Sequence, residues 1–406
     1  MIDIDFRTRS DRDTRPVDFV AFHAHLGDRL RGGNGALAAR GLARLGLPPL
    51  TIEVDGRAFT YAAGGGSIEV IPGRLPDALV APMDAATFSE LVLDLLSTTS
   101  ALLTGRVRLP PGTSQPFLLW ELVLRAMFDG RAIYEPGSIQ FRDAAGGPLE
   151  LGRVFAADDA PDEMSQFLRE TGYLIIRQLF TADEMAAVSA DIDRAIPAYR
   201  PGDGRSWWAR TAAGEQLVRL KEVQHTAPTV AALLRDSRYL GLSELCSERY
   251  PRAYCVPGSV DACIKPTGII EGISDMGWHK DCSLGRHSYD CCHLGIGFCV
   301  TDADDDHGQL CVVAGSHRTQ VPLIRTSSYS VTVPADLDLP IVALSARAGD
   351  IVIHLGCVLH MAVAPKTRER RIMYGGFDVT GAGRPLLSGD NYAAMQDPTV
   401  ARKPAS

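Results

Sequence analysis

Residues 278–281 read Trp278-His279-Lys280-Asp281, which places an imidazole and a carboxylate two positions apart. On an extended segment, residues i and i+2 project to the same side, so one metal ion can contact both side chains. A third ligand must come from elsewhere, and His360, at the end of HLGCVLH (354–360), is the best candidate. Two histidines and one carboxylate on one face of an octahedron leave three positions open, which is typical of non-haem Fe(II) oxygenases.

The order of the segments around this triplet is more specific than the triplet itself, because H-x-D occurs by chance in many chains. In order they are an apolar segment (294–300), the acidic turn TDADDDHG (301–308), the run GQLCVVAGSHR (308–318), the tetrad RAGD (347–350), the strand expected to carry His360, and RIMYGGF (371–377). The chains that contain all of these segments in this order form a much narrower class than the chains that contain H-x-D.

This order resembles the phytanoyl-CoA dioxygenase family of double-stranded β-helix oxygenases. The opening FLRETGYLIIRQLFTADEM (167–185) and the IKPTG segment (264–268) before the triplet are similar to the family's usual beginning. In outline the resemblance covers residues 160–380. It implies a C-terminal double-stranded β-helix domain, of the jelly-roll or cupin-like kind, with flanking helices.

The resemblance further implies an Fe(II) cofactor, with 2-oxoglutarate and O₂ as co-substrates, and His279, Asp281 and His360 as the metal ligands. The expected reaction is hydroxylation of an unactivated C–H bond in a small natural-product, lipid-like or carrier-bound substrate, with release of succinate and CO₂. Desaturation, epoxidation and ring formation use the same ligands and stay open. Halogenases of the family have a small residue where this chain has Asp281, so halogenation is not expected.

Basic residues near the triplet are candidates for binding the co-substrate. The resemblance makes Arg371 the partner of the distal carboxylate of 2-oxoglutarate, and a planar guanidinium suits this role because it can form two parallel charge-assisted hydrogen bonds. Arg368 and Arg370 are alternatives if the register differs, although on an extended strand Arg370 faces the opposite way from Arg371. Lys265 is predicted either to reach a carboxylate of co-substrate or substrate, or to be a solvated lysine at a strand end.

Composition excludes several classes of protein. The 406 residues suggest two or three domains, and the 46% of hydrophobic residues is enough for a real core. A net charge of −8 gives no basic field, so nucleic acid is not an expected partner. Nine cysteines, an odd number without repeated C-x-x-C pairs, favour neither a disulfide framework nor a zinc ribbon. Without a signal-like or membrane-spanning run, the chain is expected to be cytoplasmic.

The N-terminal half contains no cluster of metal-ligating or catalytic residues. It combines two predicted strands joined by a glycine turn in VDGRAFTYAAGGGSIEVIPGRLPDALV (54–80) with two apolar helices, near 84–97 and 116–130. This arrangement resembles the sterol-carrier-protein type 2 family, whose small α/β domains enclose an apolar tunnel. The resemblance implies either lipid-like cargo or a domain kept for assembly.

The two halves meet in the turn-rich connector 143–163, and we place the boundary near residue 150. The predicted fold class is therefore α+β, with a small α/β domain over residues 1–150 and the oxygenase domain over 151–406.

Two readings of function other than the oxygenase stay open. One is a ligand-binding or carrier protein with a degenerate oxygenase fold, and the other is a metal-dependent isomerase or hydrolase on a related barrel. Dependence on 2-oxoglutarate separates them from the oxygenase. Away from the triad, His317 is expected to shape a turn, and His354 to be a surface or satisfied core residue. Trp207 and Trp208 are predicted either to line a substrate pocket or to pack in the core.

Overall fold

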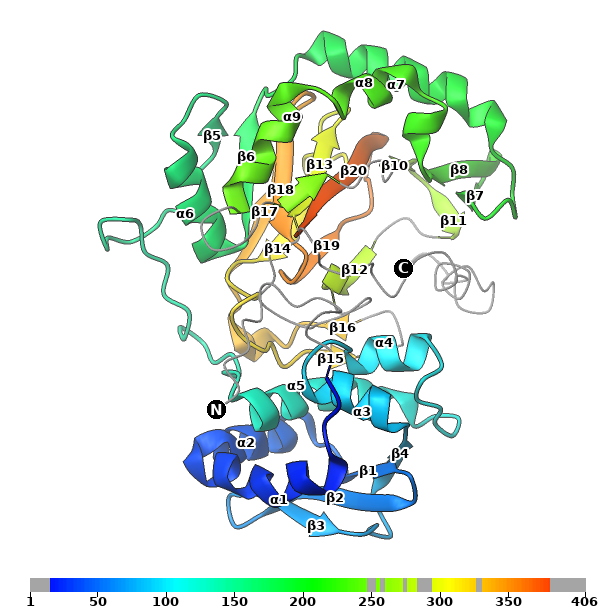
Figure 1. The fold of residues 1–406 in the computed structure, drawn as a ribbon. Helices are drawn as coiled ribbons and strands as arrows, with labels where there is room; N and C mark the ends of the chain where they lie inside the picture. Colours follow the sequence, from blue (N-terminus) through cyan, green and yellow to red (C-terminus); the bar gives the residue numbers. More distant parts are fainter. Residues whose placement is uncertain are drawn as a thin grey trace.

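The computed structural model describes residues 15–246, 253–255, 260–272, 276–282, 294–325 and 331–379. Figure 1 shows a smaller helix-and-sheet part formed by the first third of the chain and a larger, sheet-rich part formed by the rest. The mixed α+β class expected from the sequence is confirmed. None of the described helices combines the length and the hydropathy that crossing a bilayer requires.

The N-terminal part is one small sheet covered by helices. Its elements are α1 (Phe19–Arg29), η2 (Leu30–Asn34), α2 (Gly35–Leu45), β1 (Leu50–Val54), β2 (Arg57–Gly64), β3 (Ser67–Pro72), β4 (Leu79–Pro82), α3 (Ala85–Val92), α4 (Thr98–Leu103) and α5 (Ser114–Asp129). The strand order is β3-β2-β1-β4, with β1 and β4 parallel. The glycine turn between β2 and β3 is present, since Gly65 and Gly66 both have positive φ.

The larger part contains most of the strands. Its helices and helical turns are α6 (Pro161–Thr171), α7 (Ala182–Ala195), η3 (Ile196–Ala198), η4 (Val223–His225), α8 (Pro228–Leu233), α9 (Ser237–Gly241), η5 (Leu242–Cys246) and η6 (Ala335–Leu337). Its strands are β5 (Phe155–Ala156), β6 (Tyr173–Arg177), β7 (Ser206–Thr211), β8 (Gly214–Leu220), β9 (Ala253–Cys255), β10 (Asp261–Lys265), β11 (Ile269–Glu271), β12 (Met276–His279), β13 (Leu294–Cys299), β14 (Leu310–Val313), β15 (Ile324–Arg325), β16 (Val331–Thr332), β17 (Ile341–Leu344), β18 (Ile351–Leu355), β19 (His360–Ala362) and β20 (Arg370–Val379).

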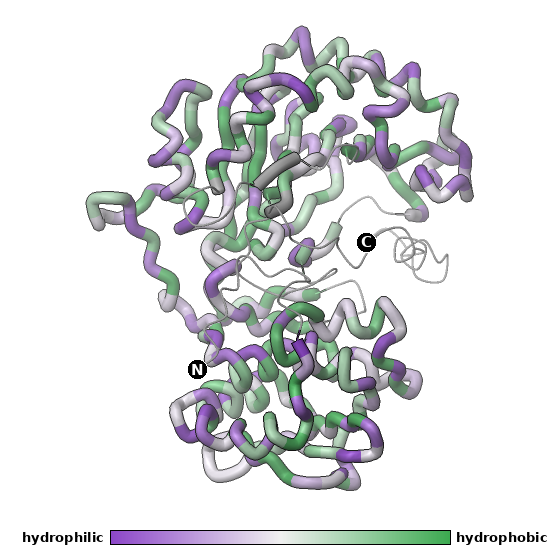
Figure 2. Tube along the Cα trace, in the orientation of Figure 1, coloured by the Kyte–Doolittle hydropathy of each residue, from purple (hydrophilic) through white to green (hydrophobic). Residues whose placement is uncertain are grey.

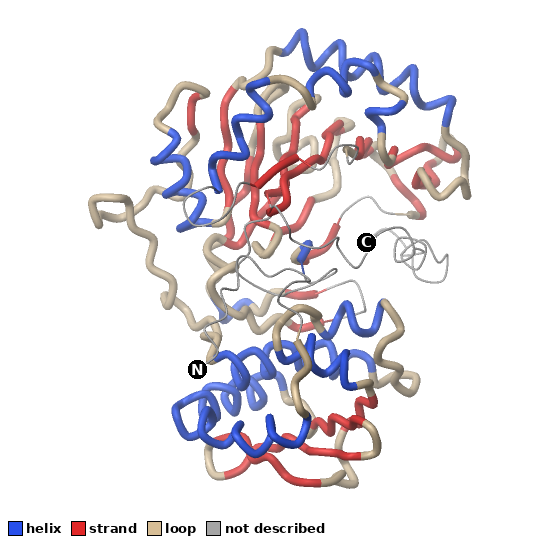
Figure 3. The backbone as a smooth tube through the Cα atoms, in the orientation of Figure 1, coloured by secondary structure: helices blue, strands red, loops and turns tan. Residues whose placement is uncertain are grey.

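Within the described residues these strands form two main sheets. The large one runs β11-β7-β8-β10-β20-β13-β18-β6-β5, with β9 added beside β20, and the small one runs β12-β19-β14-β17. Helices α7, α8 and α9 cover the outer side of the large sheet (Figures 1 and 3). Figure 2 shows hydrophobic residues gathered on its strands, whereas the covering helices alternate between hydrophobic and hydrophilic stretches.

Local sequence signals explain where the helices begin. Thr181 and Glu184 form the expected capping box at the start of α7, each accepting a hydrogen bond from the other's backbone N–H. The side chain of Asp84 caps α3 by accepting from the N–H of Thr87. Helix α7 then turns an apolar face, which includes Met185 and Ile192, onto the core of the large sheet.

The two parts have separate hydrophobic clusters joined by a short connector. One cluster takes buried residues from Phe19 to Phe128, and the other from Phe155 to Phe377. Ile133 packs against the first cluster, and it also forms a parallel β-bridge with Gln320 in the larger part. Residues 132–134, which follow α5, therefore join the two parts through backbone hydrogen bonds.

Gly349 lies just before β18, where the backbone of another segment approaches closely. A substitution there shows how much the stability of the larger part depends on this contact. The φ of Gly349 is +93°, and a Cβ there would lie 2.1 Å from the carbonyl oxygen of Phe180. We expect Gly349→Ala to lower the free energy of unfolding by about 3 kcal/mol, because strain and a clash add. Gly202→Ala, where φ is also positive but the Cβ position is open, should cost about 1 kcal/mol. Urea denaturation measures both, and equal losses would contradict the clash.

Candidate metal centre

Strands β12 and β19 are antiparallel neighbours, and their register places His279 directly opposite His360. Asp281 follows two residues after His279. Its Oδ1 lies 3.5 Å from Nε2 of His279 and 3.8 Å from Nε2 of His360. One ligand atom from each of the three residues lies within 4.8 Å of the others, so a single ion can reach all three. The structure thus brings together the three residues that the sequence singled out.

The orientation of both imidazole rings is fixed by backbone carbonyls. Nδ1 of His279 lies 2.8 Å from the carbonyl oxygen of Gly277, and Nδ1 of His360 lies 3.0 Å from that of Val358. A carbonyl can only accept, so each Nδ1 carries the proton and each Nε2 keeps a lone pair directed toward Asp281. This is the tautomer in which Nε2 of a histidine binds a metal.

Burial and neighbouring groups favour the metal-binding protonation states of His360 and Asp281. Desolvation, with His279 and His354 nearby, holds the pKa of His360 well below its ordinary value. Burial would raise the pKa of Asp281, but its interactions with His360 and His279 outweigh this effect, so this pKa lies well below its ordinary value. Neutral imidazole and ionised carboxylate are the forms that bind a divalent cation.

His354 supports this centre in a way that the sequence did not reveal. As expected of a core residue it is buried, but its ring also lies against that of His360, with centroids 4.2 Å apart. It faces Gly295 across β18 and β13, and a Cβ on Gly295 would come within 2.8 Å of the His354 ring. The glycine makes room for the imidazole, and only the strand pairing could have shown this.

His317 and the two tryptophans make contacts with residues other than the three ligands. His317 contacts the carbonyl oxygen of Arg169 at 2.9 Å, next to the positive-φ residue Gly172, which agrees with a role in shaping a turn. The ring of Trp207 packs under the guanidinium of Arg219, and the indole of Trp208 donates to the hydroxyl of Ser206.

The two consecutive arginines at the start of β20 point in opposite directions. Arg371 faces the helices, where its guanidinium donates to Asp193 and Ser189 of α7 and to the adjacent Glu369. Arg370 is fully buried on the opposite side, and its Nη1 donates to the carbonyl of Gly308. Its Nε and Nη2 have no hydrogen-bond partner among the described residues.

The inner face of β20 therefore carries Arg370, not Arg371. Lys265 lies directly opposite Arg370 in the β10–β20 register, so the two cations share this face. Tyr374 lies on the same face, and burial raises its pKa to about 12, with Arg370 and Asp281 among the charges that act on it. Which of Arg371 and Arg370, its stated alternative, would bind the co-substrate stays a prediction at this point. Arg368 is exposed in the turn before β20.

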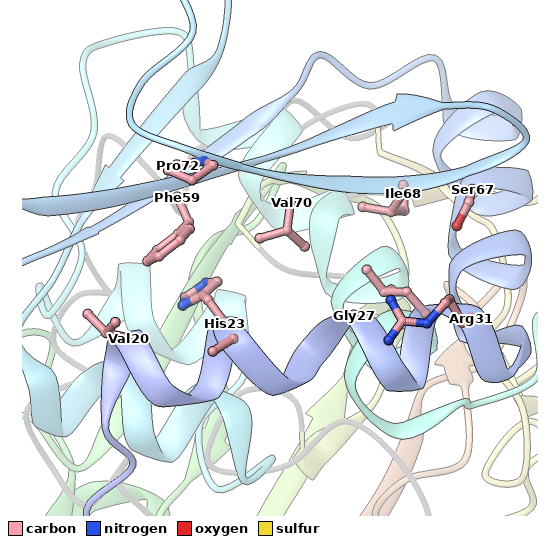
Figure 4. Close-up of a pocket in the computed structure, with 11 residues that line it drawn as sticks. Val20, His23, Gly27, Arg31, Phe59, Ser67, Ile68, Val70 and Pro72 are labelled. Carbon is pink, nitrogen blue, oxygen red and sulfur yellow. The ribbon is translucent and has the colours of Figure 1, made fainter.

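A separate groove in the N-terminal part lies between α1 and strands β2 and β3 (Figure 4). Its volume is about 470 Å³, and it is lined by Val20, His23, Ala24, Gly27, Leu30, Arg31, Phe59, Ser67, Ile68, Val70 and Pro72. Nδ1 of His23 donates to the carbonyl of Phe19, and Nε2 accepts from the hydroxyl of Tyr61 at 2.7 Å. No pattern in the sequence singled out this buried histidine. The apolar tunnel suggested by the sterol-carrier resemblance stays a prediction.

An opposed pair of imidazoles on two neighbouring strands of the small sheet, together with one carboxylate, is the donor set typical of a non-haem iron oxygenase. Comparison with known proteins agrees: residues 168–373 match the phytanoyl-CoA dioxygenase (PhyH) family model. The chain belongs to this family, and it is a 2-oxoglutarate-dependent non-haem iron dioxygenase.

Individual relatives are distant. Ectoine dioxygenase of Bordetella bronchiseptica is 26% identical over 233 residues, spanning 50% of this chain and 70% of that protein, and the Bordetella parapertussis protein is 25% identical over the same spans. Among solved structures, EctD from S. alaskensis with 2-oxoglutarate and 5-hydroxyectoine is 18% identical, with a TM-score of 0.44, covering 67% of this chain and 95% of that one. The epimerase SnoN with Fe³⁺, alpha ketoglutarate and nogalamycin RO is 19% identical, with a TM-score of 0.42, covering 53% and 82%.

The buried His23 makes a testable contribution to stability against pH. Desolvation lowers its folded pKa from 6.5 to about 4, while the unfolded chain takes up the proton near 6.5. Stability from this residue is therefore fully present above pH 6.5 and is lost as the pH falls toward 4. Between pH 7 and 5 the loss should be about 2 kcal/mol.

Urea denaturation at both pH values, for the wild type and for His23→Gln, isolates this contribution. The wild type should lose about 2 kcal/mol more than the variant between the two pH values. An identical loss in both proteins would show that His23 does not titrate as described.

Proposed function

We propose that this dioxygenase hydroxylates an unactivated C–H bond of a small natural-product, lipid-like or carrier-bound substrate, with release of succinate and CO₂. The observation that supports it most directly is the convergence of His279, Asp281 and His360, whose donor atoms lie within 4.8 Å of one another. These three would hold the iron, and bound Fe(II) would supply the activation of O₂ and the oxidative decarboxylation of 2-oxoglutarate.

The remaining residues of the site bind and orient. We assign the distal carboxylate of 2-oxoglutarate to Arg370, because its Nε and Nη2 form an edge that matches the two oxygens of a carboxylate. A buried guanidinium is costly unless an anion accompanies it, and the co-substrate would provide that anion. Lys265, across the strand pair, is placed to add a second positive charge.

Asp281 also limits the chemistry. Because this carboxylate occupies one coordination position, a halide has no place there, so we expect hydroxylation rather than halogenation. Desaturation, epoxidation and cyclisation remain alternatives that depend on how the substrate is placed.

The architecture supports a specific fold assignment. We infer that the large sheet and the small sheet are the two halves of a double-stranded β-helix, with the three ligands at its opening. The predicted domain boundary near residue 150 lies within the connector, and the cluster contacts favour a division slightly earlier, between Ile133, which packs with the first core, and Phe141, which packs with the second.

The groove beside α1 favours a second candidate role, the binding of a small apolar ligand by the N-terminal part. Its volume of about 470 Å³ is within the usual range for small-molecule sites. This role would accompany catalysis. A purely non-catalytic carrier with a decayed oxygenase fold is not favoured, because the three ligands are intact and correctly oriented.

The reaction class is tested by forming succinate. The anaerobic protein is given Fe(II) and 2-oxoglutarate, and succinate is measured after O₂ is admitted. We expect slow, substrate-free turnover in the wild type and background levels in His279→Ala, because one of the three ligands is missing. His225→Ala, which changes an exposed histidine, should match the wild type. A wild type that binds neither iron nor 2-oxoglutarate would contradict the proposal.

The co-substrate partner is tested with neighbouring variants of one strand. Arg370→Met should raise the KM for 2-oxoglutarate by about 100-fold, because two charge-assisted hydrogen bonds are lost. Arg371→Met should change this KM less than about threefold, because it removes only ion pairs on the helix side. Iron binding, measured in parallel, should persist in both variants. The opposite pattern would restore Arg371 as the partner.

A further inference from the structure

Lys280 lies between two of the proposed metal ligands, yet its side chain is used elsewhere. Its Nζ donates a hydrogen bond to the carbonyl oxygen of Ser316 at 2.8 Å. Strand β12 ends at His279, and Lys280 is the first residue after it. Through this hydrogen bond the ammonium contacts the loop that follows β14.

Ser316 contacts the other ligand-bearing segment at the same time. It is fully buried, and its hydroxyl oxygen accepts a hydrogen bond from the N–H of Leu359 at 2.7 Å. Leu359 immediately precedes His360, and its carbonyl accepts from the N–H of Val313 at 2.8 Å. One residue thus joins the segment of His279 and Asp281 to the segment of His360.

Direct backbone pairing between these two segments is sparse. Strands β12 and β19 share only two paired positions in the described residues, and the register shifts between them. Beyond β12, the N–H of Cys282 donates to the carbonyl of Gly356 at 3.1 Å. Asp281 sits between this bond and the pairing of His279.

The loop that contains Ser316 is itself held from several sides. The N–H of Gly315 donates to Thr171 at the end of α6. The hydroxyl of Thr319 and the N–H of Gln320 both donate to the carbonyl of Ala132, in the segment that follows α5. The Ser316 carbonyl therefore lies in a loop that is held both by α6 and by the segment that follows α5.

We propose that Lys280 and Ser316 form a brace that holds the proposed ligands His279 and Asp281 in place against His360 before the ion binds. Lys280 is a positioning residue in this arrangement, since it acts through the ligands on either side of it. The inference rests on the proposed ligand roles. Losing a partner that orients metal ligands typically weakens metal binding by about 10–100-fold.

The test compares metal affinity with the stability of the metal-free protein. Lys280→Met keeps the length and apolar stem but removes the ammonium, and Ser316→Ala removes the acceptor for Leu359. Each is expected to weaken binding of Fe(II), measured by anaerobic titration of the full chain, by about 10–100-fold. The melting temperature of the metal-free protein should change little. The double variant should lose less than the product of the two single losses, because both act in one brace.

Two further variants keep the test decisive. Lys280→Arg retains a cationic donor and should keep Fe(II) affinity within about threefold of the wild type. Lys366→Met removes a lysine that pairs with Asp305 on the surface and should have no effect. Unchanged affinity in Lys280→Met, or a loss matched by a fall in stability of the metal-free protein, would overturn the brace. A wild type that binds no Fe(II) would instead contradict the ligand assignment itself.

Discussion

The chemistry proposed for this protein depends on the register between two short strands. His279 and His360 face one another across β12 and β19, and a shift of either strand by one residue would turn an imidazole to the other side of the sheet. Asp281, two residues after His279, lies beside His360 only in this same register. Much of the larger part serves this alignment: β14 pairs with β19 from the other side, and His354 on β18 fills the space behind the His360 ring.

The comparison of sequence with structure separates local signals from tertiary ones. The metal triplet, the capping box at Thr181 and the glycine turn at 64–66 depend on neighbouring residues, and all of them could be predicted. Which of Arg370 and Arg371 faces inward could not be predicted. A loop of several residues separates β19 from β20, and its length does not reveal which face of the sheet each residue takes. The contact between His354 and His360 could not be predicted for a related reason: Gly295, which makes room for the His354 ring, comes from a strand distant in sequence.

The N-terminal part is not simply appended to the oxygenase. Residues 132–134 add a backbone pairing to Gln320, the hydroxyl of Tyr134 donates to the carbonyl of Asp338, and Arg44 forms an ion pair with Asp336. The first of these contacts reaches the loop after β14 that contains Ser316, and the other two reach the region of η6. A domain boundary read from composition alone shows where the chain turns often. It does not show that the turns themselves carry structural contacts between the two cores.

The arginine on the inner face of β20 has an effect on what the site can distinguish. Arg370 forms no ion pair with the described residues, so this face attracts carboxylates as a class. 2-Oxoglutarate and its product succinate both carry such a carboxylate, so the guanidinium of Arg370 would bind either of them. In the proposed site, selection between the two must therefore be made at the other end of the bound anion, beside the two imidazoles and the carboxylate of Asp281. Arg370 would retain either anion, and only the groups at the metal centre would distinguish them.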